Sequence, residues 1–138
     1  DFRESSDSGI RYFSGVASYT KSMEIAQETI NQGDVIMDLG EVNNLAEVWV
    51  NGKLAGTTWN PPYRVNITDE VTPGTNQVEI KSVNLWVNRL IGDAQPEVNE
   101  DDKITIVTSR RQFYRADSPL VPSGLVGPVQ IISLSNDR

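Results

Sequence analysis

The dipeptide Asn51-Gly52 is the feature that most constrains how this chain can fold. It separates two apolar-rich runs, AEVWV and KLAGTTW. Asn and Gly both tolerate a positive backbone φ, which a two-residue type I′ turn requires at its two central positions. Such a turn joins two antiparallel strands. The sequence therefore predicts a β-hairpin here and favours antiparallel β-structure.

Short strand patterns recur on both sides of this predicted hairpin. In VASYTKSMEI, which begins at Val16, apolar and polar residues alternate. A period of two places successive side chains on opposite faces of a strand. Lys21 interrupts the apolar face, so we expect it near the edge of a sheet. Further strand patterns occur at 34–40, 45–51, 63–68, 77–86, 102–108 and 127–135.

Together these patterns describe about eight short strands separated by turn residues. A helical period near 3.6 residues is not sustained over any long stretch. We therefore predict a single all-β domain over residues 1–138, an antiparallel sandwich or barrel with almost no helix. The acidic run from Asp93 to Asp102 lies between strands and is predicted to be a surface loop.

Composition excludes several classes of function. The chain has no Cys and no His, which removes disulfides, Ser-His-Asp and Cys-His catalysis, and most zinc and copper sites. Its net charge of −7 argues against nucleic acid and anionic membranes as partners. We find no apolar run near the roughly 20 residues of a membrane span. The polar opening DFRESSDSG lacks a signal-peptide pattern and suggests a segment of a longer protein.

The stretch NLWVNRLIGD, which begins at Asn84, mixes apolar residues with amide, guanidinium and carboxylate groups. Sugar sites combine such polar groups with an aromatic ring. Strand alternation predicts Asn84, Trp86 and Asn88 on one face, with Asn88, Arg89 and Asp93 leaving the sheet at its rim. Of these, Trp86, Asn88, Arg89 and Asp93 are candidates for carbohydrate binding. In the structural alternative, Asn88 and Arg89 hold a turn and Asp93 pairs with Arg89.

A second candidate site lies in TTWNPPYR, where two prolines stiffen the backbone between two aromatic residues. Trp59 and Tyr63, with Asn60 and Arg64 beside them, are predicted to form a carbohydrate-binding ledge. The structural alternative is that Trp59 caps the core of the sandwich.

A third, secondary candidate is the basic cluster RRQFYR, with Arg110, Arg111 and Tyr114. Arginine forks match carboxylates, so this cluster suits an anionic sugar such as a uronic acid. The alternative is ion pairing with the acidic loop at 97–102.

That loop also raises the question of a metal. Asp93, Glu97, Asp101 and Asp102 carry the oxygen ligands that calcium prefers. Their spacing does not match an EF-hand, and a solvated loop is the favoured interpretation. A structural calcium stays open as an alternative, and the prediction is that the chain holds no metal and no cofactor.

The order of these motifs resembles a known family. A strand ending in Val-Asn-Gly, followed by Gly and an aromatic residue and then by YRVNITDEVTPGTNQVEI, is similar to the sugar-binding jelly-roll domain of family 2 glycoside hydrolases. The segments NLWVNRLIGD and DSPLVPSGLVGPVQI resemble the corresponding domain of family 106 α-L-rhamnosidases. The resemblance extends from Gly9 to Ile131.

The resemblance implies an antiparallel jelly-roll β-sandwich of the galactose-binding-domain type. In these enzymes the catalytic carboxylates lie on a separate barrel domain. The chain is then expected to be a non-catalytic, carbohydrate-contacting domain beside a catalytic domain of the same parent, in the periplasm or outside the cell. In family 2 enzymes an Asp after the matching strand reaches the substrate, and Asp93 stands nearest to that position.

Two other functions remain open. The domain is alternatively a purely structural unit that packs against the catalytic barrel, or it hydrolyses a glycoside itself through a carboxylate pair drawn from Glu41, Glu47 and Asp93. Exposure of Trp59 and Trp86 is expected to distinguish sugar contact from a structural role.

Overall fold

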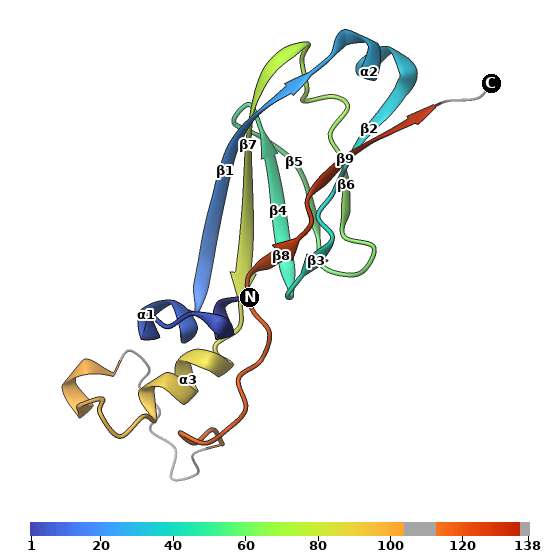
Figure 1. Cartoon of the computed structure of the whole chain (residues 1–138). Helices are drawn as coiled ribbons and strands as arrows, with labels where there is room; N and C mark the ends of the chain where they lie inside the picture. The colour runs from blue at the N-terminus through green and yellow to red at the C-terminus, as the bar shows by residue number, and fades with distance from the viewer. Residues whose placement is uncertain (104–112, 136–138) are drawn as a thin grey trace.

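The computed structural model describes residues 1–103 and 113–135 (Figure 1). Its largest sheet has four antiparallel strands in the order β1-β7-β4-β5, which are β1 (Gly15–Ile25), β7 (Gly74–Asn84), β4 (Leu45–Val50) and β5 (Lys53–Thr58). A second sheet has the order β6-β2-β9, formed by β6 (Arg64–Asn66), β2 (Gly33–Asp38) and β9 (Gln130–Ser135). A short two-stranded ladder pairs β3 (Glu41–Val42) with β8 (Leu125–Gly127).

The hydrophobic core lies between the two larger sheets. β4 and β7 of the first sheet, and β2 and β6 of the second, contribute buried aliphatic side chains to one cluster, including Val48, Ile80, Val35, Met37 and Val65. Full burial of such a side chain stabilises a fold by about 1.5–3 kcal/mol. The predicted all-β antiparallel sandwich is therefore confirmed.

The predicted hairpin is also confirmed. β4 and β5 pair through Val50 and Lys53, and the two residues between them have positive φ values, 50° at Asn51 and 79° at Gly52. The Asn51 side chain fixes this turn to the neighbouring strand, because its Oδ1 accepts a hydrogen bond from the Gln77 N–H at 3.0 Å.

The alternation predicted from Val16 onward appears in β1. Val16, Ser18 and Thr20 are exposed, whereas Ala17 and Tyr19 are partly buried on the opposite face. β1 forms one edge of the four-stranded sheet, which places Lys21 at an edge as predicted, and Lys21 is exposed there.

The strand predicted to run through Trp86 is wrong, because β7 ends at Asn84. A short helix, α3 (Val87–Asp93), follows. Val87, Leu90 and Ile91 have the i, i+3, i+4 spacing of one helical face, and alternation stops where they begin. The shared strand face predicted for Asn84, Trp86 and Asn88 is therefore wrong as well.

The described residues also form α1 (Ser8–Arg11), α2 (Gln27–Gln32), and the short 3-10 turns η1 (Phe2–Glu4) and η2 (Glu100–Asp102). Figure 1 shows α1 and α3 at one end of the sandwich and α2 at the other. A Cβ at Gly92 of α3 would lie 2.7 Å from Cβ and Cγ of Tyr12, so α3 packs closely on the residue that ends α1. Most of the strand predicted at 102–108 lies outside the described residues.

Candidate functional site

Two exposed tryptophans follow strands that finish at the same end of the four-stranded sheet. Thr58, the last residue of β5, pairs with Ala46, and Val83, next to the end of β7, pairs with Leu45 at the start of β4. We call this the β5/β7 end. One strand separates β5 from β7, so their axes lie roughly 10 Å apart at the usual strand spacing.

Trp59 follows β5, and Trp86 follows β7 by two residues. Trp59 is 67% exposed and Trp86 is 70% exposed. The alternative in which Trp59 caps the core is therefore wrong.

The other residues of the Trp59 candidate site differ in their surroundings. Asn60 is exposed, and its Nδ2 donates a hydrogen bond to the Pro61 carbonyl at 3.3 Å. Tyr63 is half-buried and packs against the core, while its carbonyl accepts a hydrogen bond from the Leu39 N–H at 2.8 Å. Trp59 and Asn60 thus face water, whereas Tyr63 anchors the loop.

Arg64 belongs to this group and forms an ion pair between β6 and β2. Its Nε donates to Asp38 Oδ2 at 2.7 Å. The backbone N–H of Gly40 donates to Asp38 Oδ1 at 2.9 Å. The Gly40 hydrogen bond and the Arg64 guanidinium lower the pKa of the Asp38 carboxyl below its ordinary value of 3.8. The Arg64 side chain remains about half exposed, so part of its guanidinium still faces solvent.

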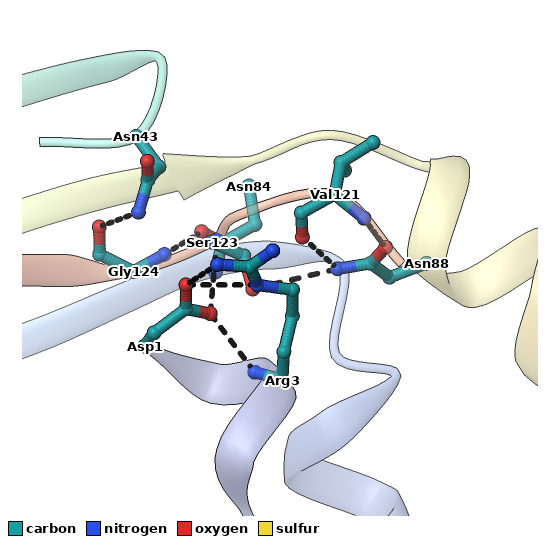
Figure 2. Close-up of polar contacts among 8 residues, drawn as sticks. All are labelled: Asp1, Arg3, Asn43, Asn84, Asn88, Val121, Ser123 and Gly124. Carbon is teal, nitrogen blue, oxygen red and sulfur yellow. Dashed lines mark hydrogen bonds and ion pairs between the residues drawn. The ribbon is translucent and has the colours of Figure 1, made fainter. Parts of the chain in front are cut away.

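Asn88, predicted at the rim, is 1% exposed. Its amide forms a two-way pair with the backbone of Val121: Nδ2 donates to the Val121 carbonyl at 2.8 Å, and Oδ1 accepts from the Val121 N–H at 2.8 Å (Figure 2). The polar groups of Asn88 therefore serve contacts within the fold.

Arg89 and Asp93 form an ion pair across one turn of α3. Asp93 is 4% exposed, and the Arg89 side chain is also mostly buried. The pairing named in the structural alternative for this stretch is therefore present. A buried pair of this kind is costly to break, since removal of one partner leaves the other charge without compensation.

The remaining candidates are the basic cluster and the acidic residues considered for a metal. Arg110 and Arg111 lie outside the described residues, and Tyr114 is exposed. Within residues 1–103 and 113–135, no group of three or more acidic side chains is placed to hold a metal ion. Asp102 instead accepts a hydrogen bond from Asn99 Nδ2 at 3.1 Å.

The three carboxylates considered for catalysis lie on different elements. Glu41 is on β3 and Asp93 is on α3. Glu47 is on β4, and its Oε2 accepts a hydrogen bond from Trp49 Nε1 at 3.0 Å. Lys81 Nζ lies 4.4 Å from the centre of the same Trp49 ring, a cation–π contact that the sequence analysis did not identify.

The β5/β7 end is organised by a segment that no sequence pattern predicted. Residues 121–124, which we call the strap, run beside the start of α3 and the end of β7 (Figure 2). Within the strap, Gly124 N–H donates to Asn84 Oδ1 at 2.8 Å. Phe2 N–H donates to the Ser123 carbonyl at 3.1 Å, and Asn43 N–H donates to the Gly124 carbonyl at 3.2 Å. Pro122 and Gly124 mark a loop in the sequence, but no local pattern reveals its partners.

Among residues 1–103 and 113–135, no helix has the length and apolar character that a membrane span requires.

Comparison with known proteins identifies the family. The family model described as "Glycosyl hydrolase 2 galactose-binding domain-like" matches residues 6–118. A curated protein of Formosa agariphila named "Putative beta-glucuronidase" is 36% identical over 143 residues, which cover 89% of this chain and 12% of that protein.

Two solved structures are similar in fold. The rhamnosidase from Novosphingobium sp. PP1Y is 44% identical, with a TM-score of 0.84, over 94% of this chain and 12% of that one. A β-glucuronidase of Ruminococcus gnavus is 20% identical, with a TM-score of 0.52, over 60% of this chain and 14% of that one. The second likeness shows the fold alone.

The chain spans only 12% of the length of the Formosa protein and of the Novosphingobium rhamnosidase. The family match covers most of the chain, and the sandwich described above agrees with it. The chain therefore belongs to the glycosyl hydrolase 2 galactose-binding-domain-like family.

Proposed function

We propose that this chain is a non-catalytic domain of a larger glycoside hydrolase and that it contacts carbohydrate through its β5/β7 end. One observation carries the proposal: Trp59 and Trp86 are both about two-thirds exposed at the same end of one sheet. Large aromatic side chains are usually buried, and exposed ones at one place favour a site of contact.

Burying the exposed surface of these two indole rings is favourable in free energy. A tryptophan offers roughly 150–250 Å² of surface, and covering the exposed two-thirds contributes about 2.5–4 kcal/mol per ring before the costs of binding. The apolar face of a pyranose ring matches such a surface. Asn60 and the solvent-facing part of Arg64, close to Trp59 in the sequence, supply donors for hydroxyl or carboxylate groups.

The names of the relatives suggest the class of ligand. One relative is named for glucuronides and one for rhamnosides. We therefore propose a saccharide that contains glucuronic acid or rhamnose, within an enzyme that degrades a polysaccharide. The carboxylates that cleave it would lie on another domain of the same parent, in the periplasm or outside the cell.

A second function, packing against the catalytic domain without binding sugar, is favoured by a different observation. Asn88, Arg89 and Asp93 are engaged in hydrogen bonds and an ion pair within this chain. In this alternative, the neighbouring domain covers the two exposed tryptophans.

Titration by NMR tests the proposal. The probes are methyl β-glucuronide and methyl α-rhamnoside, and the readout is the indole N–H resonances of the chain. We expect one probe to shift Trp59 or Trp86, and we expect Trp59→Ala and Trp86→Ala to weaken that binding. Trp49→Phe, on the outer face of the sheet, is the matched control and should bind as the wild type does. Absence of any shift with both probes would favour the packing role.

A further inference from the structure

We propose that Asn84 and Asn88 are positioning residues, which fix the backbone that carries Trp86 at the β5/β7 end by hydrogen-bonding to the strap on both sides of it. This inference rests on the proposed function for its consequence, the binding of a saccharide. The positioning itself can be tested without any ligand.

The first tie precedes Trp86. Asn84 ends β7 and is 3% exposed. Its Oδ1 accepts a hydrogen bond from the Gly124 N–H at 2.8 Å (Figure 2). A buried side chain that accepts from a backbone amide has few alternative rotamers, because moving it would leave both groups without a partner. The end of β7 is therefore held to the strap.

The second tie follows Trp86. Asn88 lies in the first turn of α3, and its amide uses both an acceptor and a donor on the backbone of Val121. Nδ2 also lies 3.5 Å from Ser123 Oγ. Two opposed hydrogen bonds fix the direction of the amide plane as well as its distance. The start of α3 is therefore held to the same strap as the end of β7.

Trp86 lies two residues from each tie, and its own backbone is fixed. The Trp86 carbonyl accepts a hydrogen bond from the Leu90 N–H at 2.9 Å, and its φ and ψ of −72° and −13° are helical. The backbone that carries the exposed indole is thus restrained by hydrogen bonds.

The strap is itself anchored elsewhere. The Ser123 carbonyl accepts from the Phe2 N–H at 3.1 Å, and the Ser123 N–H lies 3.4 Å from Asp1 Oδ1. Beyond α3, Gln95 Nε2 donates to the Ala116 carbonyl at 3.1 Å, which joins the other end of the helix to the residues that precede the strap. The two asparagines therefore link the residues around Trp86 to a segment that is itself held by hydrogen bonds to the rest of the fold.

Fixing the backbone beneath an aromatic side chain before the ligand arrives lowers the entropy that binding must remove. Ordering one mobile group on binding weakens affinity by about twofold to tenfold. Loss of either tie should therefore weaken saccharide binding within this range and leave the chemistry of the indole unchanged.

Fluorine NMR of protein labelled with fluorotryptophan tests the positioning. Asn88→Ala and Asn84→Ala should change the shift and relaxation of the Trp86 resonance, and leave the Trp59 resonance as in the wild type. Asn43→Ala is the matched control, because Asn43 also contacts the strap at Gly124 but does not flank Trp86. A folded Asn88→Ala protein with an unchanged Trp86 resonance would overturn the inference.

If a variant fails to fold, amide hydrogen exchange of the wild-type protein still tests whether the two asparagines hold the strap. The Val121 and Gly124 amides should exchange slowly, like strand amides, and rapid exchange at both would also overturn the inference. Saccharide titration separates the two proposals. If no saccharide binds, the proposed function fails while the resonances still test the positioning. If a saccharide binds and Asn88→Ala changes neither affinity nor the Trp86 resonance, the positioning alone fails.

Discussion

Asn88 on α3 and Val121 in the strap are joined by two opposed hydrogen bonds of 2.8 Å across a separation of 33 residues. This pair links the residues that follow β7 to the segment that leads into β8. It explains one of the polar residues of this mixed stretch: the amide satisfies a backbone N–H and a carbonyl of a segment that lies outside regular secondary structure.

We first predict that Asn88→Ala lowers the free energy of unfolding by about 1–3 kcal/mol, because the backbone groups of Val121 lose their partner. Urea denaturation followed by circular dichroism measures this change. Asn60→Ala, at an exposed amide beside Trp59, is the matched control and should stay within about 0.5 kcal/mol of the wild type. Equal stability of the two variants would contradict the role given to the Asn88 pair.

We next predict that Gly92→Ala destabilises the contact between α1 and α3. The added Cβ would meet Cβ and Cγ of Tyr12 at 2.7 Å, which is closer than real Cβ contacts. Overpacking of this kind costs about 1–3 kcal/mol. The expected result is a lower denaturation midpoint with little change in strand content.

A double-mutant cycle isolates this contact. Tyr12→Gly removes the atoms that the new methyl group meets, including Tyr12 Cβ. Adding Gly92→Ala to Tyr12→Gly should therefore cost less than adding it to the wild type. Additive effects would show that the cost of Gly92→Ala arises elsewhere in α3.

The sequence predicts structural features that depend on neighbouring residues, such as the turn and the strands. It does not predict features that depend on contacts between residues far apart in the chain, such as α3. Asn51-Gly52 specifies its turn through the backbone preferences of two adjacent residues, and alternation along β1 appears within one segment. Residues 87–93 form fewer than two turns of helix, which is too short for a sustained period. A helix of this length depends on tertiary contacts, here with Tyr12 and Val121, which lie far away in sequence.

In the candidate sites too, local features could be predicted from the sequence, whereas long-range contacts could not. Residue type marks Trp59 and Trp86 as candidates, and the two prolines add local stiffness at Trp59, but the sequence does not decide whether either ring is exposed. The engagement of Asn84 and Asn88 was not predicted, because Gly124 and Val121 are identified as their partners only when the strap is in place. Within one stretch, Trp86 is therefore exposed while Asn84 and Asn88 are engaged within the fold, a difference that a sequence pattern alone does not reveal.

We also predict a pH dependence of stability from Asp38. Its folded-state pKa lies below the ordinary value of 3.8, so ionised Asp38 stabilises the fold above that value. This contribution is lost as pH falls through the lower, folded-state pKa. The difference in stability between the wild type and Asp38→Asn should therefore be present near neutral pH and shrink in acid. Arg64→Gln removes the guanidinium that helps to lower this pKa and should weaken the dependence.

Finally, we predict that Asp93→Ala lowers the free energy of unfolding by about 1–3 kcal/mol, because Asp93 is buried beside Arg89 and its loss leaves the guanidinium uncompensated. Thermal melting of this domain measures the change, and Asp93→Asn, which keeps the shape of the side chain, should show a smaller loss. The saccharide affinity of the parent enzyme is measured for the same variant. A stability loss with unchanged affinity would assign Asp93 to α3 itself. Unchanged melting with weakened affinity would instead assign Asp93 to the ligand and contradict the structural role of the ion pair.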